Sequence, residues 1–348
     1  MSVRTVAVLG GSGYAGGEFL RLALGHPHLR VTQVTSRSSA GLPVPLVHPN
    51  LRGVTDLRFV PPDALAPADV VVSALPHGEL SGRLDDVASL AGGGVLVDLS
   101  SDFRLTDAEA YRLAYGRDHP RPRELGSFVY ALPELFRDRL RGATRVAGAG
   151  CIATATVLAL LPAVAAGLVD PSRDVIVEAK VGSSAVGSEP GLASHHPERS
   201  GAVRTYAPTR HRHVAEVRQA LPGAPPVHLT ATAVERVRGV LVTAHAWVRA
   251  GVTEADVLAA VRSAYDAEPF VRVVRARRGV HRFPDPRILD GSNYCDVGFE
   301  LDRDTGRLVT IAALDNLVKG TAGHAMQALN LALGWPEETG LGFTGLHP

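Results

Sequence analysis

The sequence is poor in cysteine and in aromatic residues, and it has almost no excess of charge of either sign. Among 348 residues there are two cysteines, aromatic residues make up 5%, and the formal net charge is +1. Two cysteines cannot build a disulfide framework, and they suit a reducing compartment. A nearly neutral chain has no overall field that would attract nucleic acid or a membrane surface. We therefore expect neither a disulfide-rich secreted domain nor a nucleic-acid-binding protein.

Long hydrophobic runs are also missing. No apolar run reaches the roughly 18 residues that a membrane helix needs. The Ala- and Leu-rich stretch at 155–168 is interrupted by Pro162, so we interpret it as a buried helix. The chain opens directly with a strand-like segment and a glycine loop, without the layout of a signal peptide. These features predict a cytoplasmic protein without membrane contact.

The length and the order of the segments predict two domains, because single cores rarely grow beyond about 250 to 300 residues. In the first part, short strands alternate with helical patterns, which is typical of a parallel sheet covered on both faces. After residue 151 strands outnumber helices, which favours a mainly antiparallel sheet. The predicted class is α/β, with a Rossmann-type parallel-sheet domain and a second α+β domain. The strands are expected at 3–9, 31–35, 70–74, 95–99, 175–181, 227–234, 240–248, 271–274, 295–301 and 308–312, with helices at 152–166, 253–266 and 321–334.

A glycine-rich loop follows the first predicted strand. Residues 10–16 satisfy the pattern G-x-G-x-x-G between a hydrophobic strand and a helix, which is the context this motif requires. Glycines let the backbone approach a pyrophosphate, and the helix N-terminus offers N–H groups to the anion. The alternative is a glycine-rich turn that binds nothing, and the context favours a dinucleotide site. The residues expected at the cofactor are Gly10, Ser12, Gly13, Tyr14 and Ala15.

The second predicted strand ends in Thr35-Ser36-Arg37-Ser38. An enzyme that uses NAD usually has an acidic residue here for the ribose 2′-hydroxyl, whereas an arginine with hydroxyl neighbours suits a 2′-phosphate. We therefore predict NADPH as cofactor, with Ser36 and Arg37 at its 2′-phosphate. The alternative is that Arg37 is only a solvated loop charge.

Cys151 follows the small residues 148–150 and stands at the start of a predicted helix. The N–H groups of a helix N-terminus stabilise a thiolate and lower the pKa of the thiol, so Cys151 is a candidate nucleophile. A free cysteine is more often a small buried hydrophobe, and Cys295 inside a predicted strand fits that description. The open, glycine-flanked loop sets Cys151 apart.

A cysteine nucleophile needs a base, and the densest polar cluster of the second part is Arg210-His211-Arg212-His213. A zinc site is the rival interpretation of the two histidines. Neither cysteine has a partner at metal spacing and no known zinc motif occurs, so we predict no metal. His195-His196 is a second candidate for the base, and its alternative is a solvated loop.

Several separate motifs, in one order along nearly the whole chain, resemble N-acetyl-γ-glutamyl-phosphate reductase, the acyl-phosphate reductase of arginine biosynthesis. The resemblance implies NADPH-dependent reduction of an N-blocked acyl phosphate to a semialdehyde plus phosphate, through a thioester on Cys151 with His211 as the base. It also implies a homodimer or homotetramer, an NADP-binding domain at 1–150 with 317–348, and a catalytic and oligomerisation domain at 151–316. The motifs are residues 10–18, 99–105, 150–151, 211–213 and 314–320.

The same resemblance assigns further contacts by motif position. Arg104 would hold the substrate phosphate, and Lys319 would lie near the nicotinamide. The other implied substrate contacts are Ser183, Ser184, Arg199 and His213. The other implied cofactor contacts are Leu75, Pro76, Ser100, Gly182 and Asn316.

Other segments are more similar to a sister branch, which reduces an aminoadipyl phosphate whose amino group is attached to a small acidic carrier protein in lysine biosynthesis. They include residues 148–152, 196–200, 283–286 and 291–296. Ile152 stands where that branch usually has asparagine. The arginine-branch enzyme therefore stays an alternative, and so do glutamyl and aminoadipyl chains within the carrier-linked branch.

Two segments are rich in arginine. Residues 198–218 hold five arginines against two glutamates, and residues 272–287 hold six arginines against Asp285 alone. Such clusters would steer an acidic carrier protein. The alternative is that arginine replaces lysine throughout, since Lys180 and Lys319 are the only lysines. Two other classes stay open: a Rossmann oxidoreductase without covalent catalysis, and a non-catalytic NADP-binding regulatory protein.

Overall fold

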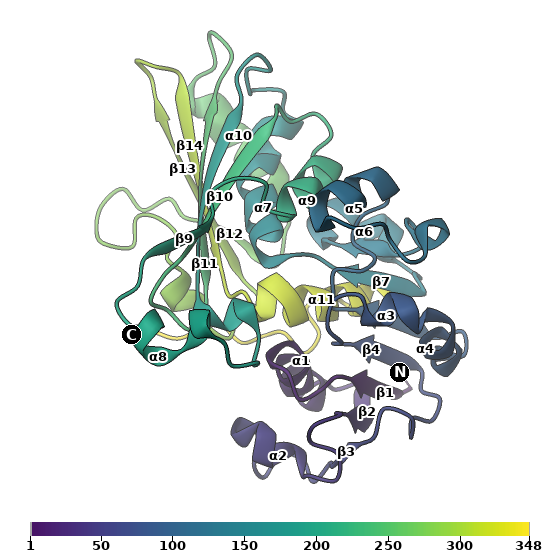
Figure 1. Ribbon diagram of the computed structural model, residues 1–348. Helices are drawn as coiled ribbons and strands as arrows, with labels where there is room; N and C mark the ends of the chain where they lie inside the picture. The colour runs from purple at the N-terminus through teal and green to yellow at the C-terminus, as the bar shows by residue number, and fades with distance from the viewer. Residues whose placement is uncertain (1, 348) are drawn as a thin grey trace. The chain divides into compact units, whose positions relative to one another are not determined.

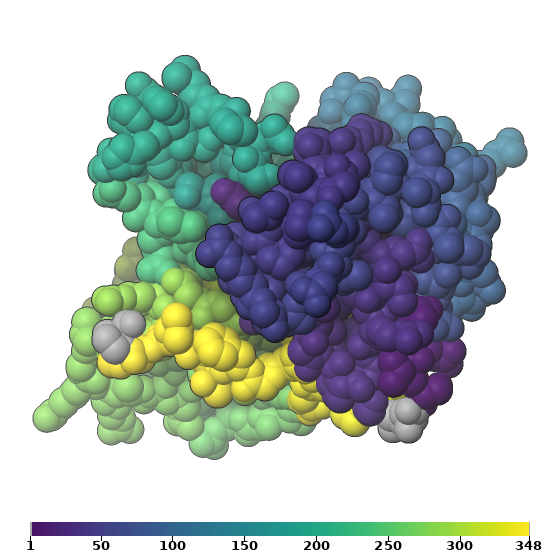
Figure 2. All heavy atoms as spheres, turned by 90° about the horizontal axis from the view of Figure 1, so that it is seen from below, coloured from purple at the N-terminus to yellow at the C-terminus, as the bar shows by residue number. Residues whose placement is uncertain are grey.

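The structure is a computed structural model that describes residues 2–347, and it divides into two compact units (Figure 1). The first unit contains the residues up to 149 together with 321–342, and the second contains 150–320 and the residues from 343 on. The predicted domain bounds differ at the end of the chain, where 317–320 and the residues after 342 lie with the second unit. Phe343 packs on Gly291 there, and the backbone at Gly345 lies against Ile288. Figure 2 shows this end of the chain, in yellow, at the surface.

The first unit is built on a seven-stranded sheet in the order β3-β2-β1-β4-β5-β7-β6, and every neighbouring pair is parallel. Strands covered on both faces read as continuous apolar runs, and all four residues of Val70–Ser73 are buried. The strands are β1 (Arg4–Leu9), β2 (Leu29–Thr35), β3 (Phe59–Val60), β4 (Val70–Ser73), β5 (Val95–Asp98), β6 (Val129–Ala131) and β7 (Arg145–Gly148).

Helices cover this sheet. The late helix α11 (Gly323–Ala332) packs on α1, α6, β5 and β7, although it is distant from them in sequence. An apolar cluster that includes Leu84, Val87 and Phe103 packs on Val71 of β4 and Leu96 of β5. The other helices of the unit are α1 (Tyr14–Leu24), α2 (Val44–Val47), α3 (Glu79–Gly82), α4 (Leu84–Ala91), α5 (Ala108–Tyr115) and α6 (Pro133–Leu140).

The second unit contains a sheet in the order β12-β13-β14-β11-β8-β10-β9. The pairs β8–β10 and β12–β13 are parallel and the other pairs are antiparallel. The predicted fold class is confirmed: a parallel Rossmann-type sheet and a mostly antiparallel second sheet. The strands are β8 (Val175–Val181), β9 (Arg204–Ala207), β10 (Val227–Ala233), β11 (Val240–Trp247), β12 (Val271–Val273), β13 (Cys295–Asp302) and β14 (Arg307–Leu314).

Three helices lie along one face of the second sheet (Figure 1). The central one, α7 (Cys151–Ala165), packs on β11 and β14, and it is flanked by α9 (His213–Ala220) and α10 (Glu254–Tyr265). Side chains of β8 and β11 therefore alternate between buried and more exposed positions. A short helix, α8 (His196–Arg199), lies in the segment between β8 and β9. Within residues 2–347, no helix combines the length and the apolar character needed to cross a membrane.

Candidate active site

The glycine loop between β1 and α1 leaves no room for side chains. Gly10 has a φ of +69°, which favours glycine, and a Cβ there would lie 2.7 Å from the carbonyl oxygen of Ala74. A Cβ on Gly16 would lie 2.7 Å from the Cα of Gly11. Gly13 is the N-cap of α1 and provides no side-chain cap, so the first N–H groups of the helix suit an anion. The loop fits the pyrophosphate of a dinucleotide, with Tyr14 and Ala15 opening the helix.

The end of β2 is tied to this loop. The hydroxyl of Ser36 donates to the hydroxyl of Ser12 at 2.9 Å, and the hydroxyl of Thr35 accepts from the backbone N–H of Gly10 at 3.1 Å. The two segments predicted to contact the cofactor therefore lie side by side in the first unit.

Arg37 is exposed, but its guanidinium has a partner that the sequence analysis did not identify. Its Nη1 donates to Oε1 of Glu79 at 3.1 Å, and its Nη2 lies 2.9 Å from Oε2. The interpretation of Arg37 as a merely solvated charge is therefore incomplete.

The turn after β4, which contains Leu75 and Pro76, is held by a buried carboxylate. Asp102 accepts from the backbone N–H of Gly78 at 2.6 Å and of Ser81 at 2.9 Å. Its Oδ1 also lies 2.7 Å from Nδ1 of His77. Burial opposes ionisation of Asp102, but His77 and these N–H groups together hold the pKa of the carboxyl below its usual value. The shape of the predicted cofactor turn thus depends on Asp102.

Ser100 and Arg104 lie in the interior of the first unit. The Ser100 hydroxyl donates to Oδ2 of Asp98 at 3.0 Å. Complete burial, followed by the charge of Asp102, raises the pKa of Asp98 to about 7. The Nε of Arg104 donates to the carbonyl of Gly148 at 2.7 Å. The contacts predicted for Ser100 with the cofactor and for Arg104 with phosphate stay predictions.

Cys151 is the first residue of α7 and is half-buried. The N-cap, Gly150, provides no side-chain cap, and its own N–H donates to Oε2 of the buried Glu216 at 2.8 Å. A Cβ on Gly320 would lie 2.5 Å from Cβ of Cys151, so only glycine fits opposite the thiol. Cys295, by contrast, is fully buried in β13. The helix N-terminus places Cys151 where a thiolate is stabilised.

The two histidines of the predicted cluster differ in environment. Burial and then the charge of Arg212 lower the pKa of His211 to about 4, although Glu216 opposes this. Nδ1 of His211 accepts from the backbone N–H of His213 at 3.2 Å, so the neutral ring carries its proton on Nε2. His213 is buried, with Nε2 3.7 Å from Oε1 of Glu216. Arg210, just before them, has a φ of +55°, which is rare outside glycine.

Tyr206 lies beside His211, and the charge of Cys151 acts on its hydroxyl. Its ring centroid lies 6.2 Å from that of His211. Desolvation and then the charge of Cys151 raise the pKa of the Tyr206 hydroxyl to about 12. Tyr206 therefore stays neutral at any physiological pH.

In the second unit, the other residues predicted to contact substrate or cofactor form hydrogen bonds that hold its loops in place. Nη2 of Arg199 donates to the carbonyl of Val234 at 2.6 Å. Backbone N–H groups of Gly182, Ser183 and Ser184 pair with the carbonyls of residues 239, 236 and 237. Asn316 donates to the Ser184 hydroxyl at 3.0 Å and accepts from the N–H of residue 239 at 2.7 Å. Lys319 is fully buried above the ring of residue 270. Their contacts with substrate or cofactor stay predictions.

Four residues around the predicted contacts were not assigned from the sequence: Glu79 and Asp102 in the first unit, and Tyr206 and Glu216 in the second. A signal existed for Glu216, which follows His213 by three residues and so shares its face of a helix. For Glu79 no local pattern existed, because its partner Arg37 is distant in sequence.

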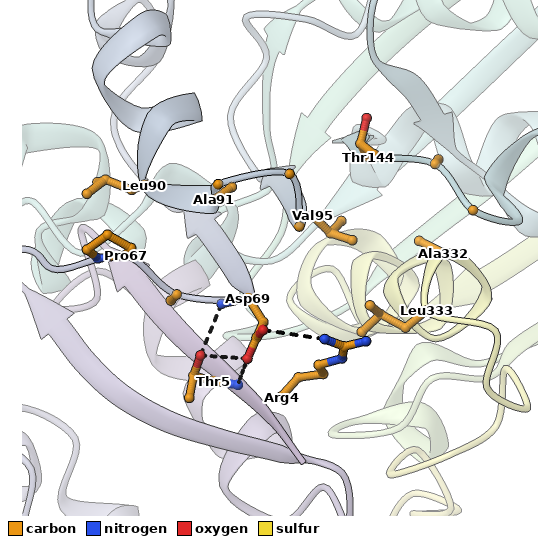
Figure 3. Close-up of a pocket in the computed structure, with 16 residues that line it drawn as sticks. Arg4, Thr5, Pro67, Asp69, Leu90, Ala91, Val95, Thr144, Ala332 and Leu333 are labelled. Carbon is orange, nitrogen blue, oxygen red and sulfur yellow. Dashed lines mark hydrogen bonds and ion pairs between the residues drawn. The ribbon is translucent and has the colours of Figure 1, made fainter. Parts of the chain in front are cut away.

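A cavity of about 620 Å³ lies elsewhere in the first unit (Figure 3). It is lined by Arg4 and Thr5 at the start of β1 and by Asp69 before β4, and Asp69 accepts from the N–H of Thr5 at 2.7 Å. Parallel α/β sheets bind their ligands at the carboxyl ends of the strands, whereas this cavity lies at the amino ends. We assign it no part in the chemistry. Among residues 2–347, no group of three or more His, Cys, Asp or Glu residues could hold a metal ion.

Comparison with known proteins decides the family. Residues 5–143 match the NAD-binding domain of semialdehyde dehydrogenases, and residues 151–316 match their dimerisation domain. The chain is 57% identical to the LysW-linked L-2-aminoadipate 6-phosphate reductase of Deinococcus radiodurans, over 99% of this chain and 98% of the relative. The chain belongs to the family of LysW-linked aminoadipate and glutamate phosphate reductases.

Other relatives agree with this assignment. The LysW-linked aminoadipate/glutamate phosphate reductase of Saccharolobus solfataricus is 42% identical, with 99% of this chain and 98% of the relative covered. Aspartate semialdehyde dehydrogenase II of Vibrio cholerae shares the fold, with a TM-score of 0.72 at 16% identity over 96% of this chain and 99% of that one. The predicted resemblance to the carrier-linked branch is confirmed, and so is the prediction of an oxidoreductase with a nicotinamide cofactor.

Proposed function

We propose that this protein reduces the acyl phosphate of a carrier-linked aminoadipate or glutamate to the semialdehyde, with NADPH as reductant and a thioester on Cys151. The observation that carries the proposal is the placement of Cys151 at an uncapped helix N-terminus, with Gly150 held by Glu216. The names of the relatives, at 42–57% identity over nearly the full chain, support the choice of substrate. We also propose a cytoplasmic location, which two free cysteines support.

The covalent step follows from the residues of the second unit. The thiol proton passes to Nδ1 of His211, the ring nitrogen without a proton, which releases its hydrogen bond from the His213 N–H. The Cys151 thiolate forms a bond to the acyl carbon, and the carbon–oxygen bond to phosphate breaks. N–H groups at the start of α7 stabilise the oxyanion that develops. After reduction the oxyanion of the hemithioacetal collapses to the aldehyde, the carbon–sulfur bond breaks, and the proton returns from His211 to the Cys151 thiolate. Arg104 is the residue predicted to bind the phosphate.

The cofactor fits the first unit. The glycine loop leaves the backbone open to a pyrophosphate, and Ser36 and Arg37 at the end of β2 are the residues that would receive the 2′-phosphate. When bound, NADPH supplies the hydride that reduces the thioester.

We propose that the acidic carrier protein binds the loop 274–285. Arg275, Arg277, Arg278 and Arg282 are all exposed, and within residues 2–347 none of them forms an ion pair. The first arginine segment is less available, because Arg199 binds backbone carbonyls and Arg204 pairs with Glu198. Arg282 lies over the ring of Phe283, 4.9 Å from its centroid, and keeps its charge exposed. Exposed positive charge that is not neutralised by an ion pair favours an oppositely charged protein surface.

We further propose a homodimer or homotetramer that forms through the second sheet. The helices of this unit cover one face, and on the other face β8 carries Ile176, 41% exposed, beside Glu178 and Lys180. The match of residues 151–316 to a dimerisation domain supports a dimer that forms through the second unit. Sedimentation at micromolar concentration tests it, since a single 36.6 kDa species would contradict the proposal.

The substrate is tested by comparing two acyl phosphates in one assay of NADPH oxidation. We expect turnover of the carrier-linked acyl phosphate and little turnover of free N-acetylglutamyl phosphate. Efficient use of the free compound would move the protein to the arginine branch. Absence of phosphate-dependent aldehyde oxidation in the reverse direction would contradict an acyl-phosphate reductase and leave a non-covalent oxidoreductase or a regulatory NADP-binding protein.

A further inference from the structure

The ion pair between Arg37 and Glu79 joins two strand ends of the first unit. Arg37 follows β2 and Glu79 is the first residue of α3 after β4, and both strands neighbour β1 in the sheet. Both carboxylate oxygens take part, with Nη1 to Oε1 at 3.1 Å and Nη2 to Oε2 at 2.9 Å. The pair therefore lies at the same edge of the sheet as the glycine loop.

A guanidinium presents its paired N–H groups to one planar anion at a time. Carboxylate and phosphate oxygens accept from the same guanidinium donors, so Glu79, which accepts from Nη1 and lies against Nη2, competes for the donors that a 2′-phosphate would need. The side chain of Arg37 is 66% exposed and that of Glu79 is 28% exposed. An ion pair this open to solvent is weak enough for a bound anion to replace it.

We propose that Glu79 is a specificity-determining residue, which competes with the 2′-phosphate of NADPH for Arg37. The inference rests on the cofactor site of the proposed function and adds a residue that lowers the preference for NADPH over NADH. Glu79 also stands in the first turn of α3, where a negative charge suits the helix N-terminus. Glutamine is thus the appropriate replacement, because it keeps the size and removes only the charge.

The test is nucleotide binding by calorimetry at low ionic strength, without substrate. Adenosine 2′,5′-bisphosphate carries the 2′-phosphate and AMP lacks it. We expect Glu79→Gln to tighten binding of the bisphosphate by about twofold to fivefold, the range of a surface charge interaction, and to leave AMP binding unchanged. Glu109→Gln is the matched control, because Glu109 forms a similar exposed pair with Arg112 on α5 of the same unit, and it should change neither affinity.

Competition for Arg37 requires that the gain depend on Arg37. In an Arg37→Gln background, Glu79→Gln should therefore leave bisphosphate binding unchanged. Weaker binding of the bisphosphate by Glu79→Gln would overturn the proposal, because Glu79 would then orient Arg37 for the phosphate. An undiminished gain without Arg37 would also overturn it. If the wild-type protein bound neither nucleotide, the cofactor site itself, and not only the role of Glu79, would be wrong.

Discussion

Gly150, the residue before Cys151, donates a hydrogen bond of 2.8 Å from its backbone N–H to the carboxylate of Glu216. The contact joins α9, which also carries His213, to the first turn of α7, and the carboxylate is fully buried. Glu216 therefore fixes the entry of the chain into the helix whose N-terminus stabilises the thiolate. Its negative charge also opposes that thiolate and favours protonation of His211.

Glu216→Gln and Glu216→Ala separate these two roles. The amide oxygen of glutamine still accepts from Gly150, so kcat should fall less than in the alanine variant. Alanine leaves a buried N–H without an acceptor, which costs about 1–3 kcal/mol of stability. Removal of the charge should shift the pH midpoint of Cys151 alkylation downward in both variants.

If Glu216 had only a structural role, its replacement would not change the pH midpoint of Cys151 alkylation. Glu254→Gln, at an exposed position of α10, is the control and should leave the profile unchanged. An identical midpoint in wild type and Glu216→Gln would contradict the electrostatic role.

His211 should set an acid limb well below the ordinary range of histidine. Burial lowers its pKa to about 4, so the neutral ring, which is the form that accepts a proton, persists as the pH falls toward that value. We expect kcat/KM of the wild type to be nearly constant between pH 7 and about pH 5 and to fall below it. His211→Asn should slow acylation and flatten this limb.

His213→Asn is the companion variant for this prediction. Both side chains lie in one cluster, with ring centroids 4.6 Å apart. A limb near pH 6.5, or a flattened limb in His213→Asn alone, would show that His211 is not the base.

The sequence predicted the long elements well because their patterns are local. The apolar run of β1 and the Ala- and Leu-rich run of α7 each identify a buried element, and the glycine loop is read from its spacing. The short strands β3, β6 and β9, together with β7, were not predicted. β3 has only two residues, and β9 is mostly exposed, so neither shows a hydrophobic period.

The site divides in the same way. Cys151 and His211 were found because a loop and a cluster of histidines mark them in the sequence. The partner of Arg37 depends on a contact across 42 residues, which no local pattern encodes. Asn316 was predicted from its motif to contact the cofactor. In the structure its amide holds Ser184 and the backbone at residue 239, a role that the motif did not indicate.

Asp98 should make the first unit less stable as the pH rises. Its pKa of about 7 in the folded state lies above the unfolded value of 3.8, so the folded state binds the extra proton between these values. The stabilisation that the Asp98 proton contributes is complete below about pH 4 and is lost as the pH rises through 7. Between these values the free energy of unfolding falls by on the order of 1 kcal/mol per pH unit. Asp98→Asn, which mimics the protonated acid, should gain stability over wild type at pH 8 and not at pH 4.5.

Urea unfolding of this unit can be followed through Trp335, with Trp247 of the second unit replaced by phenylalanine. Asp138→Asn, on the surface of the same unit, is the control. A stability difference between Asp98→Asn and its parent that does not change with pH would contradict the raised pKa.

Arg278→Glu together with Arg277→Glu should raise KM for the carrier-linked substrate, mainly through slower association. The effect should weaken with added salt, because the Debye length falls from about 10 Å at 0.1 M to about 3 Å at 1 M. Arg303→Glu, in the turn between β13 and β14, is the control for a general loss of positive charge. Equal losses in both variants, or a loss that salt does not reduce, would exclude a docking role for the loop 274–285.

The most direct measurement is the capture of the acyl-enzyme. Wild-type protein is mixed with the carrier-linked acyl phosphate in the absence of NADPH and analysed by denaturing intact-mass spectrometry. We expect a covalent adduct of one carrier on Cys151, which hydroxylamine releases and NADPH discharges as aldehyde. Cys151→Ser should form no thioester and lose about three decades or more of kcat, while still binding NADPH. Turnover above a tenth of wild type in that variant, or an adduct on another residue, would contradict thioester catalysis by Cys151.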